Sequence, residues 1–396
     1  MLKKSLIMLS MMLSVTMALL LVVPARTHYP PQVREYWIAA EEILWDYAPS
    51  FPINRMTGQP FNEDQLVFVG DGPDRIGRIY RKAVFRSYTP NFGRVIDGPN
   101  EVLNSQTGEM RIIRKPGTPS EHLGILGPII RAEVGDRVLI HFRNQTRFNL
   151  NLHPHGFFYT KDNEGTPYED GTTLKDKGDD AVPPGQSYTY TWLVPDRAGP
   201  GPEDPNSIVW PYHSHVNEVA DTNAGLVGAI VVHKQGTLQK KSGLPLGVDR
   251  EFVNLFTVFD ENSSLYIDAN IEEFVGESVD PTLREKSDED FVESNLMHGI
   301  NGLLYANLKG MTMKEGEQVR WYLLAMGTEV DIHTPHWHGE TLLYAGHRTD
   351  ITEIFPASAK TLDMIADDPG TWMYHCHVND HLNAGMMTLF AVEPIS

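Results

Sequence analysis

Ten of the 16 histidines fall in four short clusters with the spacing of metal ligands on β-strands. The clusters are His153 and His155 in "HPHG", His213 and His215 in "HSH", His333, His336 and His338 in "HTPHWHG", and His375, His377 and His381 in "HCHVNDH". Side chains two residues apart on a strand point to the same face, so each "HxH" pair directs both imidazoles the same way. Eight histidines can therefore converge on one site: His153, His155, His213, His215, His336, His338, His375 and His377. Imidazole ligands with open coordination positions are typical of copper or zinc sites.

The single cysteine, Cys376, lies between two of these histidines and favours copper over zinc. Because side chains alternate along a strand, its thiol points away from both neighbours and into the interior of its own domain. His333, His381 and Met386 can meet it there. Two imidazoles, a thiolate and a distant thioether form the ligand set of a blue-copper electron-transfer site. The sequence thus predicts a one-electron copper site that is joined covalently to a site with several metals.

Short alternating or β-branched runs between Gly, Pro and Asn/Asp residues predict the elements that carry these clusters. Examples are "RVLIHF", "SYTYTWLV", "LVGAIVVH", "VRWYLLAM" and "MTLFAV". The two halves also repeat each other: residues 133–156 match residues 314–339, and "WPYHSHVNEVADTNAGLVGAIVV" matches "WMYHCHVNDHLNAGMMTLFAV". Such a repeat indicates two copies of one unit. We therefore expect an all-β chain of two β-sandwich domains with few helices.

Composition shifts along the chain predict the domain boundaries. Residues 1–25 have two lysines, an apolar run and a small-residue end, which is the pattern of an export signal peptide. An uncleaved membrane anchor is the alternative for the same run, which is nearly long enough to span a bilayer. The first domain is expected at 28–236 and the second at 247–396, with the linker in the Lys-, Gly- and Pro-rich stretch 233–250. The Gly- and Pro-rich stretch 51–128 is predicted to be an insertion of irregular loops.

The net charge and the cysteine count restrict the cellular location and the binding partners that we expect for the protein. The formal net charge of -19 disfavours nucleic acid or an anionic membrane as a partner and favours small cations near the surface. One cysteine excludes an internal disulfide. Together with the signal segment, this predicts an exported protein, periplasmic or extracellular, with no membrane contact beyond that segment.

The four clusters, taken in this order, resemble the multicopper oxidase family over nearly the whole chain after the signal. The resemblance implies two cupredoxin-like Greek-key β-sandwich domains and four coppers per chain. The implied type 1 copper ligands are His333, Cys376, His381 and Met386. The implied type 2 ligands are His153 and His336, and the implied ligands of the type 3 pair are His155, His213, His215, His338, His375 and His377. In the first domain, Leu150, Ser214 and Val219 stand where His, Cys and His would be needed, and an aliphatic residue near Leu226 replaces the methionine. Only the second domain should hold a type 1 copper.

The resemblance also bears on assembly. Family members place the trinuclear site between the first and last domains of a ring, so a two-domain relative is expected to form a homotrimer with three such sites between subunits.

Within the family, the ceruloplasmin and hephaestin ferroxidases are most similar, through "REYWIAAEEILWDYAP", "ESNLMHGINGLLYANLKGMTM" and "HCHVNDHLNAGM". This similarity implies an Fe(II) substrate site at Glu293, His298 and Asp380, with Glu329 of a neighbouring subunit as a fourth ligand. Carboxylates stabilise Fe(III) over Fe(II), which favours electron removal, and Asp380 directly precedes His381. The expected function is thus oxidation of Fe(II) coupled to the reduction of O2 to water.

Other functions stay open at this point. The same copper centres would serve a laccase-like phenol oxidase or an oxidase of Mn(II) or Cu(I). A copper nitrite reductase would need a blue site in the first domain, which Ser214 excludes. A non-catalytic copper-binding relative is disfavoured because none of the twelve expected ligand positions is missing. Finally, Asp179 and Asp180 in "KDKGDD" resemble a calcium-binding loop of ceruloplasmin, which makes calcium a second candidate cofactor.

Overall fold

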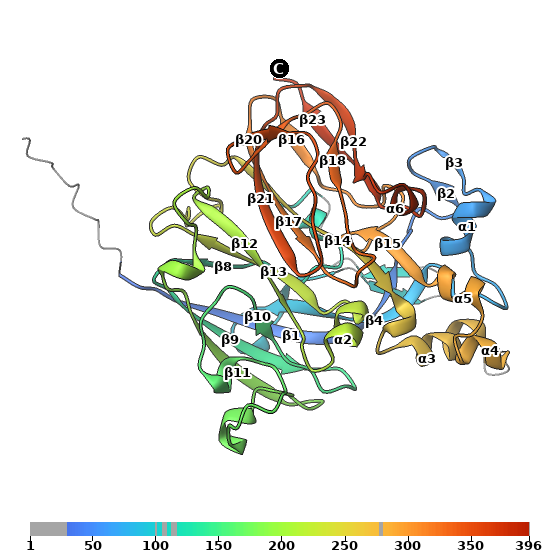
Figure 1. Ribbon diagram of the computed structural model, residues 1–396, viewed down its shortest axis with the longest axis horizontal. Helices are drawn as coiled ribbons and strands as arrows, with labels where there is room; N and C mark the ends of the chain where they lie inside the picture. The colour runs from blue at the N-terminus through green and yellow to red at the C-terminus, as the bar shows by residue number, and fades with distance from the viewer. Residues whose placement is uncertain (1–29, 100, 105–108, 112–116, 277–279, 396) are drawn as a thin grey trace, which may run out of the picture. The chain divides into compact units, whose positions relative to one another are not determined.

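A computed structural model describes residues 30–99, 101–104, 109–111, 117–276 and 280–395 (Figure 1). The predicted signal peptide, residues 1–25, lies outside the described residues. From Pro31 onward the chain forms one compact unit. Within the described residues, no helix combines the length and the apolar character needed to cross a bilayer.

The first half of the chain is a sandwich of two sheets. The five-stranded sheet has the order β11 (Ser187–Leu193), β9 (Arg137–Asn144), β1 (Val33–Asp46), β4 (Ile79–Tyr88) and β5 (Val95–Asp97). The four-stranded sheet has the order β10 (His153–Pro154), β12 (Ser207–His213), β13 (Val227–His233) and β8 (Ile130–Glu133). Buried residues of both sheets, such as Phe85, Phe142, Tyr212 and Ile230, pack in one core between them.

The second half repeats this arrangement. Its six-stranded sheet has the order β15 (Leu296–Ile300), β14 (Arg250–Asp260), β17 (Gln318–Ala325), β21 (Ser358–Ile365), β19 (Leu342–Tyr344) and β20 (His347–Thr349). Its four-stranded sheet has the order β16 (Thr312–Lys314), β23 (Met387–Glu393), β22 (Gly370–Cys376) and β18 (Pro335–Trp337). The core between them contains Trp321, Tyr374, Cys376 and Met386.

Strand pairing confirms the internal repeat. β1 runs parallel to β9 and β14 runs parallel to β17, so the first strand of each half pairs in parallel with the corresponding strand of its own sheet. Likewise, β13 runs parallel to β8 and β23 runs parallel to β16. The all-β prediction of two sandwiches is therefore confirmed, whereas the domain boundaries at 28–236 and 247–396 stay a prediction. No regular strand or helix lies between β13 and β14, where the linker is expected.

The prediction of irregular loops for residues 51–128 is wrong for β4, which pairs with β1 along ten residues from Ile79 to Tyr88. The sequence "IYRKAVFRSY" does not predict this strand, because it contains charged side chains that are not expected in a buried strand. Lys82 and Arg86 are both buried, and they form ion pairs with Glu261 and Glu41 respectively. The partner of Lys82 comes from the other half of the chain, so the local sequence gives no sign of it.

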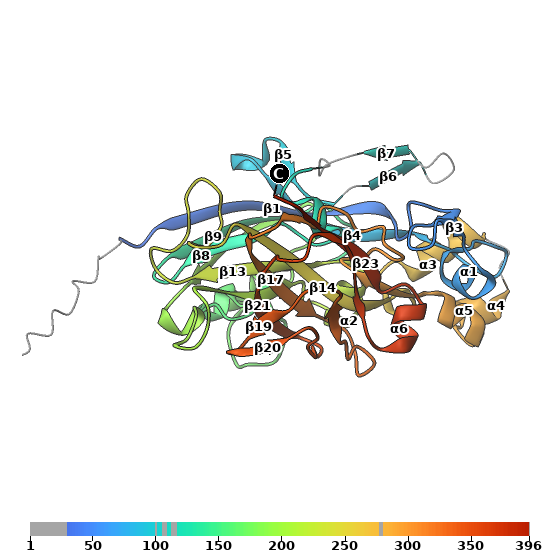
Figure 2. The same ribbon diagram turned by 90° about the horizontal axis from the view of Figure 1, so that it is seen from above.

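Short helices and two hairpins complete the described chain. The helices are α1 (Glu63–Val69), α2 (Glu218–Ala224), α3 (Ile267–Asn270), α4 (Pro281–Arg284), α5 (Glu289–Ser294) and α6 (Asn379–Asn383). The hairpins are β2 (Ile53–Asn54) with β3 (Gln59–Pro60), and β6 (Glu101–Asn104) with β7 (Glu109–Arg111), the latter seen clearly in Figure 2. Single turns of 3-10 or π helix are η1 (Pro90–Phe92), η2 (Glu121–Leu123), η3 (Lys161–Asn163), η4 (Leu174–Lys177), η5 (Asp196–Ala198), η6 (Glu261–Ser263) and η7 (Ile271–Val275).

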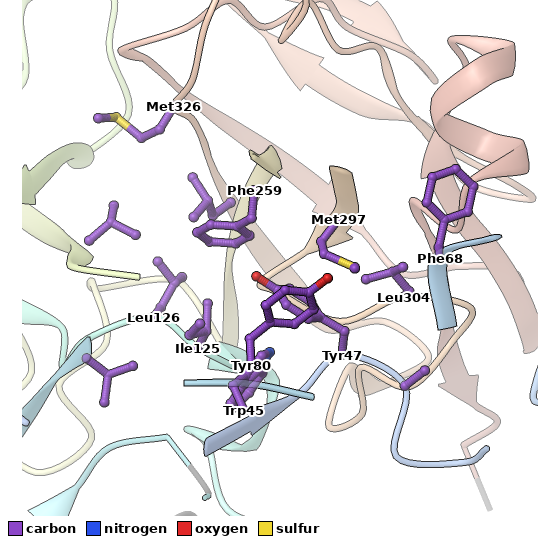
Figure 3. Packing of buried hydrophobic residues seen from close by; sticks show 14 of the residues in the cluster. Trp45, Tyr47, Phe68, Tyr80, Ile125, Leu126, Phe259, Met297, Leu304 and Met326 are labelled. Atoms are coloured by element: carbon purple, nitrogen blue, oxygen red, sulfur yellow. The ribbon is translucent and has the colours of Figure 1, made fainter. Parts of the chain in front are cut away.

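A third apolar cluster joins the two halves. It combines Trp45 and Tyr80 of the first half with Phe259 and Met297 of the second (Figure 3). The indole of Trp45 donates to the carbonyl oxygen of Gly302 at 2.7 Å, which fixes strand β1 against the second sandwich. Burying these large side chains contributes roughly 1.5–3 kcal/mol each. The metal-binding candidates of both halves are therefore carried by one continuous, closely packed body.

Candidate metal centres

The structure brings the three predicted strong ligands of the blue site together in the second sandwich. The ligand atoms of His333, Cys376 and His381 all lie within 4.8 Å of one another, and all three residues are buried. The Sγ atom of Cys376 is 3.9 Å from Nδ1 of His333 and 3.6 Å from Nδ1 of His381. Cys376 ends β22, and His381 lies in α6, the helix that follows it. The fourth predicted ligand, Met386, is fully buried in the same core, and its carbonyl oxygen accepts the amide hydrogen of Cys376 at 3.0 Å.

The electrostatics of this centre favour a thiolate. Burial alone would raise the pKa of Cys376, but hydrogen bonds with His333 and His381 lower that pKa to about 6. The backbone amide of Thr334 also donates to the sulfur, at 3.4 Å. A deprotonated sulfur is the form that binds a metal.

Three histidines of the second half form another cluster beside the blue site. The ligand atoms of His336, His338 and His375 lie within 4.8 Å of one another. Nε2 of His375 is 3.1 Å from Nδ1 of His336 and 3.1 Å from Nε2 of His338. The ring of His377 is centred 5.4 Å from that of His375. Because β18 pairs with β22 in the register His336 to His375, the strands themselves bring the two motifs together.

The first half holds a corresponding quartet. β10 pairs with β12 in the register His153 to His213, which repeats the pairing of the second half. Nε2 of His155 lies 3.1 Å from Nε2 of His213. The ring of His215 is centred 5.2 Å from those of His153 and His213. The sequence prediction that "HxH" pairs share a face is thus confirmed for all four pairs.

Three of these imidazoles, those of His155, His213 and His375, are held in the neutral, ligand-ready form. Burial is the main cause that lowers the pKa of His155 and of His375 to about 4 and the pKa of His213 to about 3. His375 and His213 direct Nδ1 at the carbonyl oxygens of Cys376 and Ser214, at 2.8 and 3.0 Å. Because a carbonyl oxygen only accepts, Nδ1 carries the hydrogen and Nε2 keeps its lone pair for a metal. Clusters of neutral imidazoles of this kind fit copper.

The two quartets do not meet within one chain. Among the described residues, each ring contact or hydrogen bond between these eight histidines joins members of the same half. Neither quartet therefore contributes ligands to the other's contacts within the described part of the chain.

The predicted iron ligands are partly assembled. His298, on β15, is buried with its ring centred 5.3 Å from that of His381. Its Nδ1 faces the carbonyl oxygen of Leu296 at 2.8 Å, so Nε2 keeps its lone pair, and burial followed by the charge of His381 lowers its pKa to about 4. Glu293 and Asp380 are exposed, on α5 and α6, and their oxygens do not form a ligand cluster within 4.8 Å with His298. Glu329 is also exposed, in the loop after β17.

In the first half, one residue that was predicted to stand in place of a type 1 ligand is assigned wrongly. Leu150, Ser214 and Leu226 are all fully buried, whereas Val219 is 53% exposed and cannot occupy an interior ligand position. The residue in the place of His381 is Asp221, because the amide of Leu226 donates to the carbonyl oxygen of Asp221 as that of Met386 does to His381. The loop of the first half is two residues longer, so counting from the histidines gives the wrong residue.

Sequence reasoning also missed Asp331, a buried carboxylate 3.2 Å from Nε2 of His333.

At the calcium candidate, Asp179 is buried, and Oδ1 has no hydrogen-bond partner among the described residues. Its Oδ2 accepts the amide hydrogen of Gly165 at 2.7 Å, and burial is the main cause that raises its pKa to about 6. The neighbouring carboxylate of Asp180 lies 3.7 Å from Nζ of Lys177.

Comparison with known proteins agrees with this geometry. Family models described as "Multicopper oxidase" match residues 123–237 and 278–396. The human protein named Ferroxidase HEPHL1 is 44% identical over 362 residues, which cover 91% of this chain and 29% of that protein. Human hephaestin is 41% identical over 364 residues, covering 91% of this chain and 28% of hephaestin, and human ceruloplasmin is 40% identical over 364 residues, covering 91% and 30%. The chain thus spans less than a third of the length of these relatives.

Solved structures share the fold. The blue copper oxidase from Nitrosomonas europaea superimposes with a TM-score of 0.52 at 18% identity, covering 92% of this chain and 86% of that chain. The multicopper oxidase mgLAC has a TM-score of 0.54 at 18% identity, covering 92% of this chain and 88% of that chain. The two sandwiches are therefore cupredoxin folds, and with the matched family models and the histidine and cysteine motifs, the chain belongs to the multicopper oxidase family.

Proposed function

We propose that this chain is a ferroxidase-like multicopper oxidase, which oxidises Fe(II) in one-electron steps and reduces O2 to water. Bound copper supplies the redox chemistry, because it changes oxidation state by one electron. The chain's own residues select and hold the ions, fix their spacing and keep the ligands deprotonated. The buried thiol of Cys376, with its lowered pKa, is the residue on which the electron-transfer site depends.

The proposed ligand assignment follows the family pattern. His333, Cys376, His381 and Met386 hold the type 1 copper, His153 and His336 hold the type 2 copper, and His155, His213, His215, His338, His375 and His377 hold the type 3 pair. Four coppers per chain result. Cys376 is bonded through the backbone to a histidine on each side, so the path from the thiolate to the histidine clusters stays within three consecutive residues.

The observation that carries the choice of Fe(II) is the position of His298 against the blue site. Its ring is centred 5.3 Å from that of His381, and its Nε2 atom is free to bind a substrate ion. Glu293 and Asp380 would complete the site from the exposed side, together with Glu329 of a neighbouring subunit. Anionic oxygen ligands stabilise Fe(III) more than Fe(II), so they lower the energy needed to remove the electron.

The separation of the two histidine quartets supports a homotrimer. One heterologous interface, repeated three times around an axis, would bring the first-half quartet of each chain to the second-half quartet of its neighbour. Each of the three interfaces would then contain one complete trinuclear site. Export to the periplasm or the exterior is proposed from residues 1–25 alone.

The test is oxygen uptake by the copper-loaded protein with Fe(II), Mn(II) and a simple phenol, each offered to wild type and to Glu293→Gln. We expect rapid Fe(II) turnover in the wild type and a loss of about 10-fold or more in the variant, because one anionic ligand is removed. Phenol turnover should be unchanged. Glu272→Gln is the matched control, since Glu272 is another exposed carboxylate of the second half.

Two other outcomes of this experiment would indicate a substrate other than Fe(II). Phenol oxidation that is as fast as Fe(II) oxidation and indifferent to Glu293 would indicate a laccase-like enzyme. Mn(II) turnover above Fe(II) turnover, and lost in Glu293→Gln, would indicate a manganese oxidase with the same oxygen ligands. Absence of bound copper would indicate a non-catalytic relative.

Calcium at Asp179 and Asp180 is a separate proposal, supported by the buried Oδ1 atom of Asp179, for which the described part of the chain offers no hydrogen-bond partner. A cation there would satisfy a group that is otherwise costly to bury. Calcium should raise the melting temperature of the wild type but not that of Asp179→Asn, as measured by thermal unfolding with and without a chelator.

A further inference from the structure

Ser214 in the first half occupies the place of Cys376 in the second. The amide of Cys376 donates to the carbonyl oxygen of Met386 at 3.0 Å, and the amide of Ser214 donates to that of Leu226 at 3.1 Å. The amide of Thr334 approaches the sulfur of Cys376 at 3.4 Å, and the amide of Asn151 approaches the hydroxyl oxygen of Ser214 at 3.3 Å. Both side chains are fully buried. Ser214 is therefore the structural counterpart of the thiol ligand.

Asp221 occupies the place of His381, and its side chain contacts Ser214 directly. The hydroxyl of Ser214 donates to Oδ2 of Asp221 at 2.6 Å. The same oxygen accepts the backbone amides of Val216 and Asn217, each at 3.1 Å. Asp221 is only 1% exposed, so these three donors satisfy a carboxylate that would otherwise be costly to bury. The carboxylate thus connects the end of β12 to helix α2.

Asn151 extends this connection to the histidines. Its Oδ1 accepts the amide hydrogen of His215 at 2.6 Å, and its Nδ2 donates to the carbonyl oxygen of Asp180 at 2.6 Å. Asn151 lies two residues before His153, and Ser214 lies between His213 and His215. His213 and His215 are therefore adjacent to a member of the network Ser214–Asp221–Asn151, and His153 lies two residues from another member.

We propose that Ser214, Asp221 and Asn151 form a metal-free replacement for the type 1 centre, which positions the copper-binding histidines of the first half. In the second half, β22 and α6 would be connected because Cys376 and His381 bind the same metal ion. In the first half, the hydrogen bonds to Asp221 connect the corresponding strand and helix. Leu150 and Leu226 fill the places of the other two ligands. These three are positioning residues, and this role rests on the proposed trinuclear site.

The test compares variants that differ in hydrogen-bond acceptors at one buried position. Asp221→Leu removes the acceptor, whereas Asp221→Asn keeps one oxygen that can accept from all three donors. We expect type 3 copper affinity to fall about 10- to 100-fold in Asp221→Leu and to be largely retained in Asp221→Asn. Thr222→Val is the matched control, because Thr222 is buried on the same helix and its hydroxyl has no hydrogen-bond partner among the described residues.

Copper titration of the apo protein, followed by the separate absorption bands of the type 3 pair and of the blue site, provides the readout. The blue band should titrate as in the wild type in every variant, because Cys376 is in the other sandwich. Ser214→Ala keeps the two backbone hydrogen bonds of Asp221 and should weaken type 3 binding about fivefold. Ser214→Ala therefore tests the positioning role even if Asp221→Leu yields no folded protein.

Three results would overturn the positioning role: type 3 titration unchanged in Asp221→Leu, a loss in Thr222→Val as large as in Asp221→Leu, or type 3 titration unchanged in Ser214→Ala. Failure of the proposed function is distinguishable, because it would show as a missing type 3 band in the wild type itself.

Discussion

Asp331 and His333 are joined by a hydrogen bond in the interior of the second sandwich, with Nε2 of His333 3.2 Å from Oδ1 of Asp331. The carboxylate is itself held by the backbone amides of Val258, at 2.6 Å, and Thr328, at 2.9 Å. It therefore fixes the imidazole with Nδ1 directed at Cys376. Burial alone would lower the pKa of His333, but the hydrogen bonds to Asp331 and Cys376 raise it above its ordinary value.

Replacing Asp331 by asparagine should change the properties of copper bound at this centre. The carboxylate makes His333 a stronger donor, which favours Cu(II), so Asp331→Asn should raise the reduction potential and weaken copper binding about 10- to 100-fold. A redox titration of the blue absorption measures the first effect and copper titration of the apo protein the second. Thr257→Val removes a hydroxyl that lies 3.4 Å from Asp331 and donates to the carbonyl oxygen of Met326 at 2.9 Å, but it keeps the charge of Asp331, so the potential should stay near that of the wild type. Equal potentials in Asp331→Asn and Thr257→Val would show that the charge has no influence.

A mixing experiment tests whether the trinuclear site is shared between chains. His155→Ala disables the first-half quartet and His338→Ala disables the second-half quartet, so each variant alone should lose O2 reduction. In mixed trimers, an interface that joins the intact halves of the two variants regains a complete site, and roughly a quarter of the wild-type activity should return when the chains assemble at random. The measurement is oxygen uptake after the two variants are unfolded and refolded together. A mixture as inactive as either variant would mean that both quartets must come from the same chain.

His233 should make the fold sensitive to acid. Its side chain is fully buried at the end of β13, neither ring nitrogen has a hydrogen-bond partner among the described residues, and burial followed by the charge of Arg131 lowers its pKa to about 3. Below pH 6.5 the unfolded chain binds a proton that the folded chain does not, so stability falls as the pH decreases, by up to about 1.4 kcal/mol per pH unit. His233→Leu should flatten this slope between pH 6.5 and pH 4 in denaturant unfolding of the apo protein. Parallel curves for the two proteins would show that His233 does not contribute.

The sequence predicts the strands and which histidines share a face, because both depend on local alternation. The "HxH" pairs share a face in any extended strand, and Cys376 then has to face inward. Features that depend on distant partners were missed. Strand β4 contains Lys82, whose partner Glu261 is 179 residues away, and Asp331 matters only because folding directs it at His333. Because the loop of the first half is longer, the sequence does not show that Asp221 corresponds to His381. The backbone hydrogen bonds show this correspondence.

We propose that electrons from Fe(II) reduce O2 completely to water. The most direct measurement is the ratio of Fe(II) oxidised to O2 consumed by the copper-loaded protein, recorded together with an assay for hydrogen peroxide. We expect a ratio of about four and no peroxide, because four one-electron donors are needed for each O2 reduced to water. A ratio of about two with accumulating peroxide, or oxidation of Fe(II) at the rate seen without protein, would contradict it.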